Sequence, residues 1–342
     1  MCMLIEEFKS GKYEKGFDYE YFVPTKINRN WNWKNSELSL LLEKASLGLG
    51  EINSYGRIVP NISLFIQLYV KKEAVISSRI EGTQTGINEA IMPEEEISSE
   101  KRTDWREVRN YSLAMNEAIE KLNKLPLSSR LLKNIHRTLM EGVRGKHKLP
   151  GEFRTSQNWI GGTTLKDAVF IPPAHHLVND LMGDLENFIH NREISVPDLI
   201  KIGIIHYQFE TIHPFLDGNG RIGRLLIPLY MIQKNILNKP LLYLSEYFEK
   251  DRTLYYENLM KVRNENNLLH WLKYFLIGIG ETSKRASKVL NNTLKLKENT
   301  EKLLRKEAGR RADSALILFE ELFKSPVVKV NDVIRICNLS KK

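Results

Sequence analysis

The stretch that most constrains the fold is an apolar helical stripe that runs directly into a glycine-rich loop. In "LIKIGIIHYQFETI", apolar residues recur three and four positions apart, as on one face of a helix. Ser195 and Pro197, just upstream, are residues that often start a helix. The sequence therefore predicts a helix that ends where the loop begins, with a stripe formed by Leu199, Ile202, Ile205, Phe209 and Ile212.

The loop and the residues after it, His213 to Arg224, read "HPFLDGNGRIGR" and contain the Gly-x-Gly-x-x-Gly spacing of a dinucleotide-binding loop. That use of the glycines requires a buried strand before the first glycine and an acidic residue about 20 positions after the last. The segment "LLYLSE" would supply the acid, Glu246, at the end of a short strand. Because the upstream segment is helical, the sequence argues against a dinucleotide-binding fold.

Composition limits the class of protein. The 342-residue chain can bury a large core, and its two cysteines, Cys2 and Cys337, lie at opposite ends. The sequence opens with neither a run of about 18 apolar residues nor a charged-then-apolar leader. We therefore expect a reduced, cytoplasmic protein with no membrane partner. Residues 284 to 311 carry ten Lys and Arg against three Glu, a net charge of +7 out of +9 for the chain. A solvated helix face is the first interpretation of this segment, and an anionic partner such as DNA is the alternative.

Helical periodicity dominates the rest of the chain, so we expect a mainly α fold, a helical bundle with one small β-hairpin. Residues 38 to 92 predict helices, the second of them opened by Pro60-Asn61. The charged segment 93 to 104 has no periodic apolar face and predicts a solvated connection. We expect three units: an N-terminal helical domain (1–100), a core domain (101–285) and a basic helix with a partial winged-helix-like segment (286–342).

One interruption of the helical pattern, at residues 155 to 173, predicts the hairpin. Two short β-prone runs flank a Gly-Gly-Thr-Thr turn, and Pro172-Pro173 stops the second run. Residues 1 to 37 are expected to pack as an extended, aromatic-rich segment.

Two short amphipathic helices are predicted near the C-terminus, in "DSALILFEELFK" and "VKVNDVIRICNLSKK", with a turn around Ser325-Pro326. The pair resembles the beginning of a winged-helix or helix-turn-helix module, whose recognition helix would start near Ser340. A module without that helix cannot read a DNA groove. We therefore interpret the pair as a remnant or as a truncated module.

The residues around the glycines favour a phosphate site served by a divalent cation. Asp217 precedes the first glycine, and a carboxylate beside a phosphate is repulsive unless a cation such as Mg²⁺ lies between them. Arg221 and Arg224 stand three apart on one face of the helix that follows. Together with the N–H groups at the N-terminus of that helix, they predict phosphate binding. A zinc site has no recognisable ligand spacing among His175, His176, His206 and His213.

These residues resemble the signature of the Fic family, HxFx(D/E)GNGRxxR, and every defined position is filled. In addition, "SSRIEG" resembles the family's inhibitory pattern (S/T)xxxE(G/N), and residues 155 to 173 resemble its target-docking flap. The resemblance covers roughly residues 38 to 285. The order of the segments is similar to that of family members whose inhibitory helix is N-terminal to the core. The matching residues are His213, Phe215, Asp217, Gly218, Asn219, Gly220, Arg221 and Arg224 in the signature, and Ser77, Glu81 and Gly82 in the inhibitory pattern.

The resemblance implies a protein adenylyltransferase, which moves AMP from ATP to a Ser, Thr or Tyr hydroxyl of a target protein and releases pyrophosphate. His213, with an unperturbed pKa of about 6.5, would take the proton of that hydroxyl. Asp217 would hold Mg²⁺ between the α- and β-phosphates. The remaining phosphate contacts would come from Gly218, Asn219 and Gly220 at the α-phosphate, Arg221 at the β-phosphate and Arg224 at the γ-phosphate.

The resemblance also implies that Glu81 inhibits the enzyme by occupying Arg224. ATP would then lose a ligand of its terminal phosphate, and the α-phosphorus would lose its alignment with the incoming hydroxyl. Ser77 would fix the inhibitory helix by hydrogen bonding, and Gly82 completes the pattern. Some relatives use the glutamate to remove AMP and a few transfer phosphocholine or phosphate, so de-AMPylation through Glu81 stays open as an alternative.

The flap would pair its open edge with an extended segment of the target and bring the target hydroxyl over His213. The target could be this chain itself, and a homodimer is expected by analogy alone. A DNA-binding regulator is the alternative from a different class; its DNA affinity would fall steeply with salt and would not change in His213→Ala. The flap residues that would carry docking are Ile160, Gly161, Gly162, Val169, Phe170 and Ile171.

Overall fold

The computed structural model describes residues 2–58, 62–145, 147–324 and 327–339. These residues form a mainly helical fold with two small two-stranded sheets, which confirms the predicted class. None of the described helices is both long and apolar enough to span a membrane. The helices are α1 (Ser36–Ile58), α2 (Ile62–Ile80), α3 (Ile87–Ala90), α4 (Arg102–Leu122), α5 (Ser129–Leu139), α6 (Val178–His190), α7 (Asp198–Ile212), α8 (Asn219–Gln233), α9 (Ser245–Lys250), α10 (Arg252–Glu265), α11 (Leu268–Glu307), α12 (Ala312–Lys324) and α13 (Val330–Ile336).

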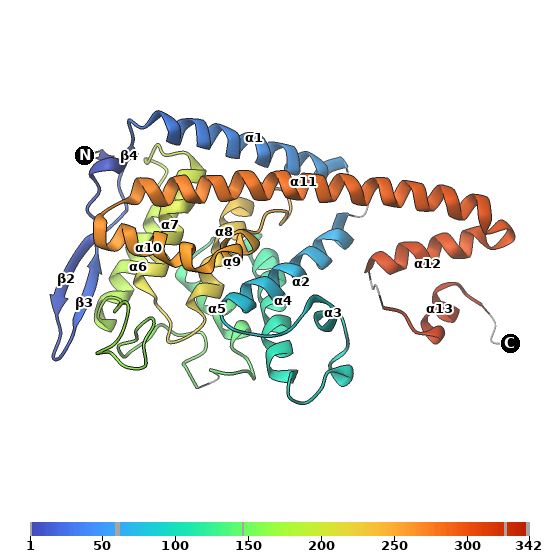
Figure 1. The fold of residues 1–342 in the computed structure, drawn as a ribbon, viewed down its shortest axis with the longest axis horizontal. Coiled ribbons are helices and arrows are strands. Elements are labelled where there is room, and N and C mark those ends of the chain that lie inside the picture. The colour runs from blue at the N-terminus through green and yellow to red at the C-terminus, as the bar shows by residue number, and fades with distance from the viewer. Residues whose placement is uncertain (1, 59–61, 146, 325–326, 340–342) are drawn as a thin grey trace.

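The bundle is built around α7, the helix predicted from the apolar stripe. Every residue of α7 from Leu199 to Ile212 is buried, as expected for a helix that is largely apolar on all faces. Helix α8 packs against it, and α1 runs alongside the first part of α11 on one side of the bundle (Figure 1). One continuous apolar core extends from Ile5 to Ala286. It places the loop between α7 and α8 on a rigid base.

The N-terminal segment contains strands that the sequence did not indicate. Strands β2 (Gly11–Lys15) and β3 (Glu20–Pro24) form an antiparallel hairpin, and β1 (Met3–Leu4) pairs in parallel with β4 (Trp31–Asn32). Aromatic packing fixes the segment as expected: Phe8 lies edge-on to Trp31 at 5.0 Å between ring centroids, and both are buried. The hairpin is seen beyond one end of the bundle (Figure 1).

The predicted hairpin at residues 155 to 173 is reduced to an isolated antiparallel bridge between Ile160 and Phe170. Gly161 and Gly162 both have φ of 70°, and Asp167 accepts hydrogen bonds from the backbone N–H groups of Thr163 and Thr164 at 2.9 and 2.6 Å. The carboxylate therefore closes a compact turn in place of further strand pairs.

The flap residues divide into an anchored part and an exposed part. Phe170 is buried against Phe22 and the guanidinium of Arg263, and the carbonyl of Ile171 accepts a hydrogen bond from the N–H of Phe22 at 2.9 Å. Val169 is 66% exposed. The segment is thus held by the N-terminal hairpin on one side and open at its tip.

Two further expectations are corrected in detail. Residues 93 to 104 hold a short 3-10 turn, Glu94–Glu96, and the first residues of α4, so the connection is shorter than predicted. The segment "LLYLSE" forms no strand: residues 241 to 244 are irregular and α9 begins at Ser245. A dinucleotide-binding fold would need a strand before the loop, where the structure has α7, and a strand before Glu246, where the chain is irregular.

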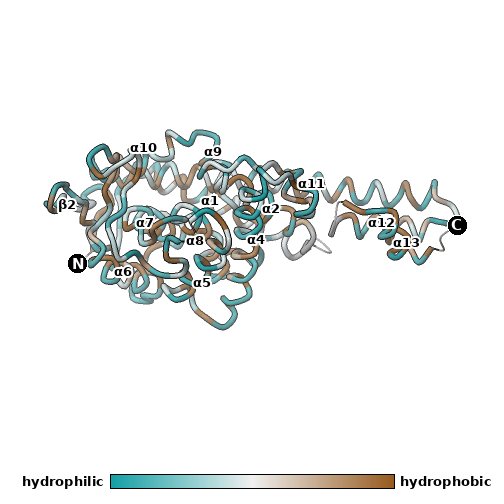
Figure 2. Tube along the Cα trace, turned by 90° about the horizontal axis from the view of Figure 1, so that it is seen from below, coloured by the Kyte–Doolittle hydropathy of each residue, from teal (hydrophilic) through white to brown (hydrophobic). Residues whose placement is uncertain are grey.

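Both predicted C-terminal helices are present, as α12 and α13. Helix α12 packs against the end of α11, which extends beyond the rest of the bundle, and α13 packs against α12 (Figures 1 and 2). Helix α11 is continuous from Leu268 to Glu307, so it crosses the boundary proposed at residue 285 without a break. The division into three units stays a prediction. The Pro60-Asn61 helix start, the Ser325-Pro326 turn and the recognition-helix start at Ser340 lie partly or wholly outside the described residues.

Candidate active site

The glycine-rich loop connects the C-terminus of α7 to the N-terminus of α8 through two left-handed residues. His213 ends α7 with φ of 50° and ψ of 60°, and Gly218 precedes α8 with φ of 76°. A non-glycine residue in this conformation is uncommon and is often found at functional sites. Helix α8 begins directly after this turn, and the first N–H groups of a helix have no partner within the helix, so its N-terminus is a site where a phosphate can bind.

His213 is half-buried, and its backbone is held from the flap side. Its carbonyl accepts hydrogen bonds from Nε of Arg154 at 3.0 Å and from Nδ2 of Asn158 at 3.2 Å. Burial lowers the pKa of His213 to about 3, helped by the positive charges of Arg263 and Arg154. The imidazole is therefore neutral at pH 7 and has a free lone pair with which to accept a proton.

Asn219 fixes the shape of the loop. Its Oδ1 accepts from the N–H of Phe215 at 2.8 Å, and its Nδ2 donates to the carbonyl of the same residue at 2.8 Å. Both polar atoms of the amide thus bind the loop backbone in this structure. The α-phosphate contact of Asn219 stays a prediction, and its loop-shaping contact is an addition to it.

His136 of α5 contacts two residues of the loop, Phe215 and Asp217. Its ring stacks on Phe215 at 3.9 Å between centroids, and its Nδ1 accepts from the N–H of Gly151 at 2.8 Å. Nε2 lies 3.0 Å from the carbonyl oxygen of Asp217, so the neutral ring carries its proton there and donates it. Burial lowers the pKa of His136 to about 4, which keeps this tautomer uncharged near neutral pH.

Asp217 has the exposure and chemistry of a magnesium ligand. Its side chain is 45% exposed, and Nη2 of Arg221 lies 3.8 Å from its Oδ1. The described residues contain no group of three or more His, Cys, Asp or Glu that could hold a metal. A single accessible carboxylate fits Mg²⁺, which is usually held by one or two carboxylates together with substrate phosphates and waters.

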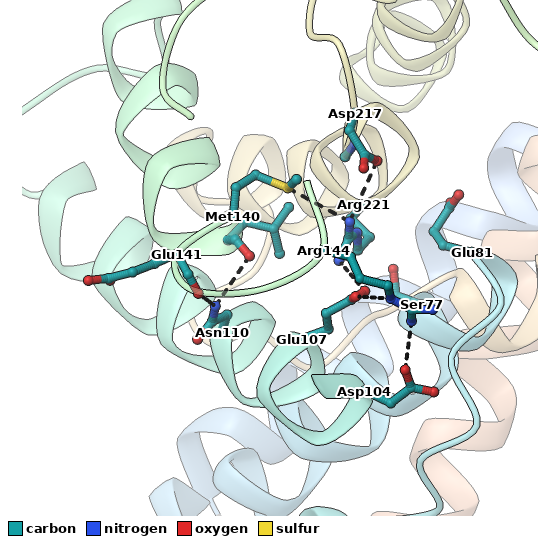
Figure 3. Close-up of polar contacts among 12 residues, drawn as sticks. Ser77, Glu81, Asp104, Glu107, Asn110, Met140, Glu141, Arg144, Asp217 and Arg221 are labelled. Atoms are coloured by element: carbon teal, nitrogen blue, oxygen red, sulfur yellow. Dashed lines mark hydrogen bonds and ion pairs between the residues drawn. The ribbon is translucent and has the colours of Figure 1, made fainter. Parts of the chain in front are cut away.

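Arg221 is buried beneath the loop in an acidic setting (Figure 3). Its Nη1 donates to Oε2 of Glu107 at 3.0 Å, and Oε1 of the same carboxylate accepts from Nε of Arg144 at 2.9 Å. Arg144 also pairs with Asp104 at 2.6 Å. Glu107 and Asp104 come from α4 and Arg144 comes from the loop after α5, far from the glycines along the chain, so no local sequence pattern identifies them.

Arg224 contacts two of the three residues of the inhibitory pattern, Ser77 and Glu81. Its Nη2 lies 2.6 Å from Oε1 of Glu81, its Nε donates to Oγ of Ser77 at 2.8 Å, and Nη2 also donates to the Ser77 carbonyl at 2.9 Å. Burial alone would raise the pKa of Glu81, but the charge of Arg224 outweighs it and lowers the pKa below its usual value. Glu81 is therefore ionised and paired at neutral pH.

Glycines make this pairing sterically accessible. A Cβ at Gly220 would clash with Oε1 of Glu81, so the carboxylate lies directly over the first turn of α8. Gly82, with φ of 102°, turns the chain immediately after Glu81. The structure thus brings together the signature residues and the inhibitory residues, which lie more than 130 positions apart in the sequence.

His206, one of the four histidines without zinc-ligand spacing, has a structural role. It is buried, with Nδ1 at 2.9 Å from the carbonyl of Gly223 and Nε2 at 2.9 Å from the hydroxyl of Tyr255. Both ring nitrogens are therefore occupied by hydrogen bonds. This arrangement explains why a histidine is accommodated inside the central helix.

Comparison with known proteins supports the family resemblance. Residues 39–120 match the family model for the Fic/DOC family N-terminal region, and residues 126–231 match the model for the Fic/DOC family. A probable protein adenylyltransferase of Aquifex aeolicus is 30% identical over 184 residues, or 51% of each chain. Protein adenylyltransferase Fic of Drosophila erecta is 26% identical over 174 residues, which cover 48% of this chain and 31% of the relative. The chain thus matches about half the length of these relatives, or less.

Solved structures show the same fold. A Fic family protein from Desulfovibrio desulfuricans has a TM-score of 0.57 at 20% identity, covering 90% of this chain and 86% of its own. Fic-1 from C. elegans has a TM-score of 0.54 at 19% identity, covering 76% and 74%. At these identities the likeness establishes the fold. The two family models together match more than half of the described fold, including the loop between α7 and α8, and this chain belongs to the Fic/DOC family.

Proposed function

We propose that this chain is a protein adenylyltransferase that Glu81 holds in an inhibited state. The observation that carries the proposal is the ion pair between Glu81 and Arg224, 2.6 Å long, directly over the N-terminus of α8. The same helix terminus presents a neutral histidine, an accessible carboxylate and a second buried arginine. Two relatives, 30% and 26% identical over the matched residues, bear the names probable protein adenylyltransferase and protein adenylyltransferase Fic.

The reaction follows from the protonation states of the site. Neutral His213 takes the proton of a target hydroxyl as its oxygen attacks the α-phosphorus of ATP. The new bond joins that oxygen to phosphorus, the bond from the α-phosphorus to the bridging oxygen breaks, and pyrophosphate leaves. The proton stays on His213 until the product departs. An imidazole with a lowered pKa is available as the base at pH 7, and the negative charge of bound phosphates would raise its basicity.

The remaining residues bind and orient ATP. We assign the N–H groups of Gly218 and Gly220 with Asn219 to the α-phosphate, Arg221 to the β-phosphate and Arg224 to the γ-phosphate. Asp217 would hold Mg²⁺, which neutralises charge on the phosphates when it is bound. Because Arg224 has only one guanidinium, its contact with Glu81 competes with the γ-phosphate. Ser77, buried and bonded to Nε of Arg224, fixes the other edge of that guanidinium.

Target binding is assigned to the segment between residues 155 and 173. Its anchored residues, Phe170 and Ile171, fix it to the body of the protein, and the exposed tip offers backbone to an extended peptide. A peptide at the bridge of Ile160 and Phe170 would lie near His213, whose carbonyl accepts hydrogen bonds from Asn158 in this segment and from Arg154 just before it. We place the enzyme in the cytoplasm, with another protein or a second copy of this chain as its substrate.

Intact mass after incubation with ATP and Mg²⁺ tests the proposal. We expect an added AMP mass that is strong in Glu81→Gly, weak in the wild type and absent in Glu81→Gly with His213→Ala. Glu100→Gly, an exposed carboxylate in a turn, is the matched control and should behave as the wild type. If no AMP appears on this chain in any variant, labelled ATP and a cell lysate test other targets. An adduct that survives His213→Ala, or no labelled protein in either experiment, would contradict the proposal.

A further inference from the structure

Glu107 lies between two arginines and uses both of its carboxylate oxygens (Figure 3). Oε2 accepts from Nη1 of Arg221 at 3.0 Å, and Oε1 accepts from Nε of Arg144 at 2.9 Å. The Glu107 side chain is 6% exposed and that of Arg221 is 4% exposed, whereas that of Arg144 is 60% exposed. A buried carboxylate therefore links a buried arginine of the phosphate site to an arginine at the surface.

Glu107 differs from Glu81 in position, exposure and number of bonded oxygens, and each difference makes Glu107 harder to displace from its arginine. Glu81 lies in the turn after α2, is 31% exposed, and contacts Arg224 through Oε1 alone. Glu107 lies inside the 21-residue helix α4 and is bonded through both oxygens. A buried partner bonded through both oxygens orients an arginine, whereas a partly exposed partner bonded through one oxygen is easier to displace.

The remaining donors of Arg221 are not committed to strong partners. Nη2 lies 3.8 Å from Oδ1 of Asp217 and 3.8 Å from the sulfur of Met140, and buried Nε has no hydrogen-bond partner among the described residues. Glu107 therefore fixes one end of the guanidinium and leaves the other end beside Asp217. A phosphate bound to Asp217 through a cation could therefore accept hydrogen bonds from Nη2 and Nε of Arg221.

Arg144 balances the charge of this arrangement. A carboxylate paired with Arg221 alone would neutralise the positive charge that a phosphate needs, but Glu107 divides its charge between two cations. Arg144 is itself held by Asp104, whose other oxygen accepts from the N–H of Gln84 at 2.7 Å. The loop that carries Arg144 also approaches the cation site, because a Cβ at Gly145 would lie 2.8 Å from Oδ2 of Asp217.

We propose that Glu107 is a positioning residue for phosphate binding, and that Arg144 is the counter-ion that keeps Arg221 electrostatically available. This inference rests on the proposed function, because it takes Arg221 as the ligand of the β-phosphate. The inference predicts an effect on nucleotide affinity that depends on the number of phosphates in the nucleotide. Loss of Glu107 or Arg144 weakens binding of ADP and ATP, which carry a β-phosphate, and spares AMP, which has none.

Calorimetric titration of AMP, ADP and α,β-methylene-ATP in the presence of Mg²⁺ tests this, with Glu81→Gly as the parent protein. We expect Glu107→Gln to weaken ADP and analogue binding about 10-fold, as expected for a misplaced ligand, and to leave AMP unchanged. Arg144→Ala should weaken ADP binding about 3-fold, less at high salt, because the side chain is exposed and screened. Arg144→Lys keeps the positive charge, so its ADP affinity should lie between those of Arg144→Ala and the parent protein. Glu117→Gln and Arg106→Ala, on the same helix as Glu107 and away from the loop, are the matched controls.

The outcomes separate the possible failures. If Glu81→Gly binds none of the three nucleotides, the proposed function is wrong. If it binds them and Glu107→Gln weakens AMP as much as ADP, Glu107 has only a structural role and the inference is overturned. Unchanged or tighter ADP binding in Glu107→Gln also overturns it. If Glu107→Gln does not fold, surface-exposed Arg144→Ala decides: a loss selective for ADP supports the inference, and no loss overturns it.

Discussion

The neutral state of buried His136 makes a quantitative prediction about acid stability. Its imidazole is fully buried, accepts from Gly151, donates to the Asp217 carbonyl and stacks on Phe215, and burial lowers its pKa from 6.5 to about 4. In the unfolded chain the ring is solvated and takes up a proton near pH 6.5. Between pH 6.5 and 4 the unfolded state therefore binds more protons than the folded state, and the free energy of unfolding falls as the pH falls.

The magnitude follows from the two pKa values. At about 1.4 kcal/mol per pKa unit, the full shift corresponds to on the order of 3 kcal/mol, of which about 2 kcal/mol is lost between pH 7 and pH 5. Because the side chain is completely buried, solvent screening does not reduce the effect. The variant His136→Gln has no titratable group at this position, so it lacks this part of the pH dependence.

Urea unfolding of the wild type and His136→Gln at pH 7, 6 and 5 measures the effect. All other side chains are the same in both proteins, so their contributions cancel in the difference between the two free energies of unfolding. We expect the wild type to lose about 2 kcal/mol relative to the variant from pH 7 to pH 5. Free-energy curves that stay parallel over this range would refute the assignment of a neutral, buried His136.

Three further predictions concern other parts of the site. Burial raises the pKa of Glu73 to about 7 although Tyr111 and Ser245 donate hydrogen bonds to it, so the folded state binds the proton more tightly than the unfolded state. From pH 5 to pH 8, the free energy of unfolding of the wild type should therefore fall by on the order of 2 kcal/mol relative to Glu73→Gln. A constant difference between the two proteins in urea unfolding would contradict this. Gly218→Ala should lower stability by about 1–2 kcal/mol in thermal unfolding and reduce AMP transfer, because φ of Gly218 is 76° and the new Cβ would lie 3.2 Å from the Met140 sulfur. The control is Gly183→Ala, which lies within a helix and has open space around it. Val169→Asp should reduce target modification with no change in ADP affinity, measured by labelled transfer and by calorimetry; equal transfer would argue against docking at the flap.

The central element could be predicted because its signals are local. The apolar stripe from Leu199 to Ile212 predicted α7, and the residues from His213 to Arg224 predicted the loop and the start of α8, as found. The contact between Glu81 and Arg224 was expected from the family pattern alone, since no property of the sequence around Glu81 identifies its partner. The fold class followed from periodicity along the whole chain.

The errors arose where tertiary contacts override local preference. The expected flap strands shrink to a single bridge because Asp167 closes the turn and β3 holds Ile171. The N-terminal hairpin was missed because its short strands have no clear alternation and depend on partners across the chain. Glu107 and Arg144 were missed for a similar reason: a glutamate on a helix and an arginine in a loop look like surface residues until the fold places them under Arg221.

The most direct test of the proposed function follows which phosphate of ATP is transferred. Glu81→Gly would be incubated with Mg²⁺ and with ATP labelled either at the α-phosphorus or at the γ-phosphorus, alone and with cell lysate, and labelled protein would be quantified. We predict protein labelling from the α-position, none from the γ-position, and loss of the α-label when His213→Ala is added. Labelling from the γ-position, or α-labelling that does not depend on His213, would contradict AMP transfer by this site.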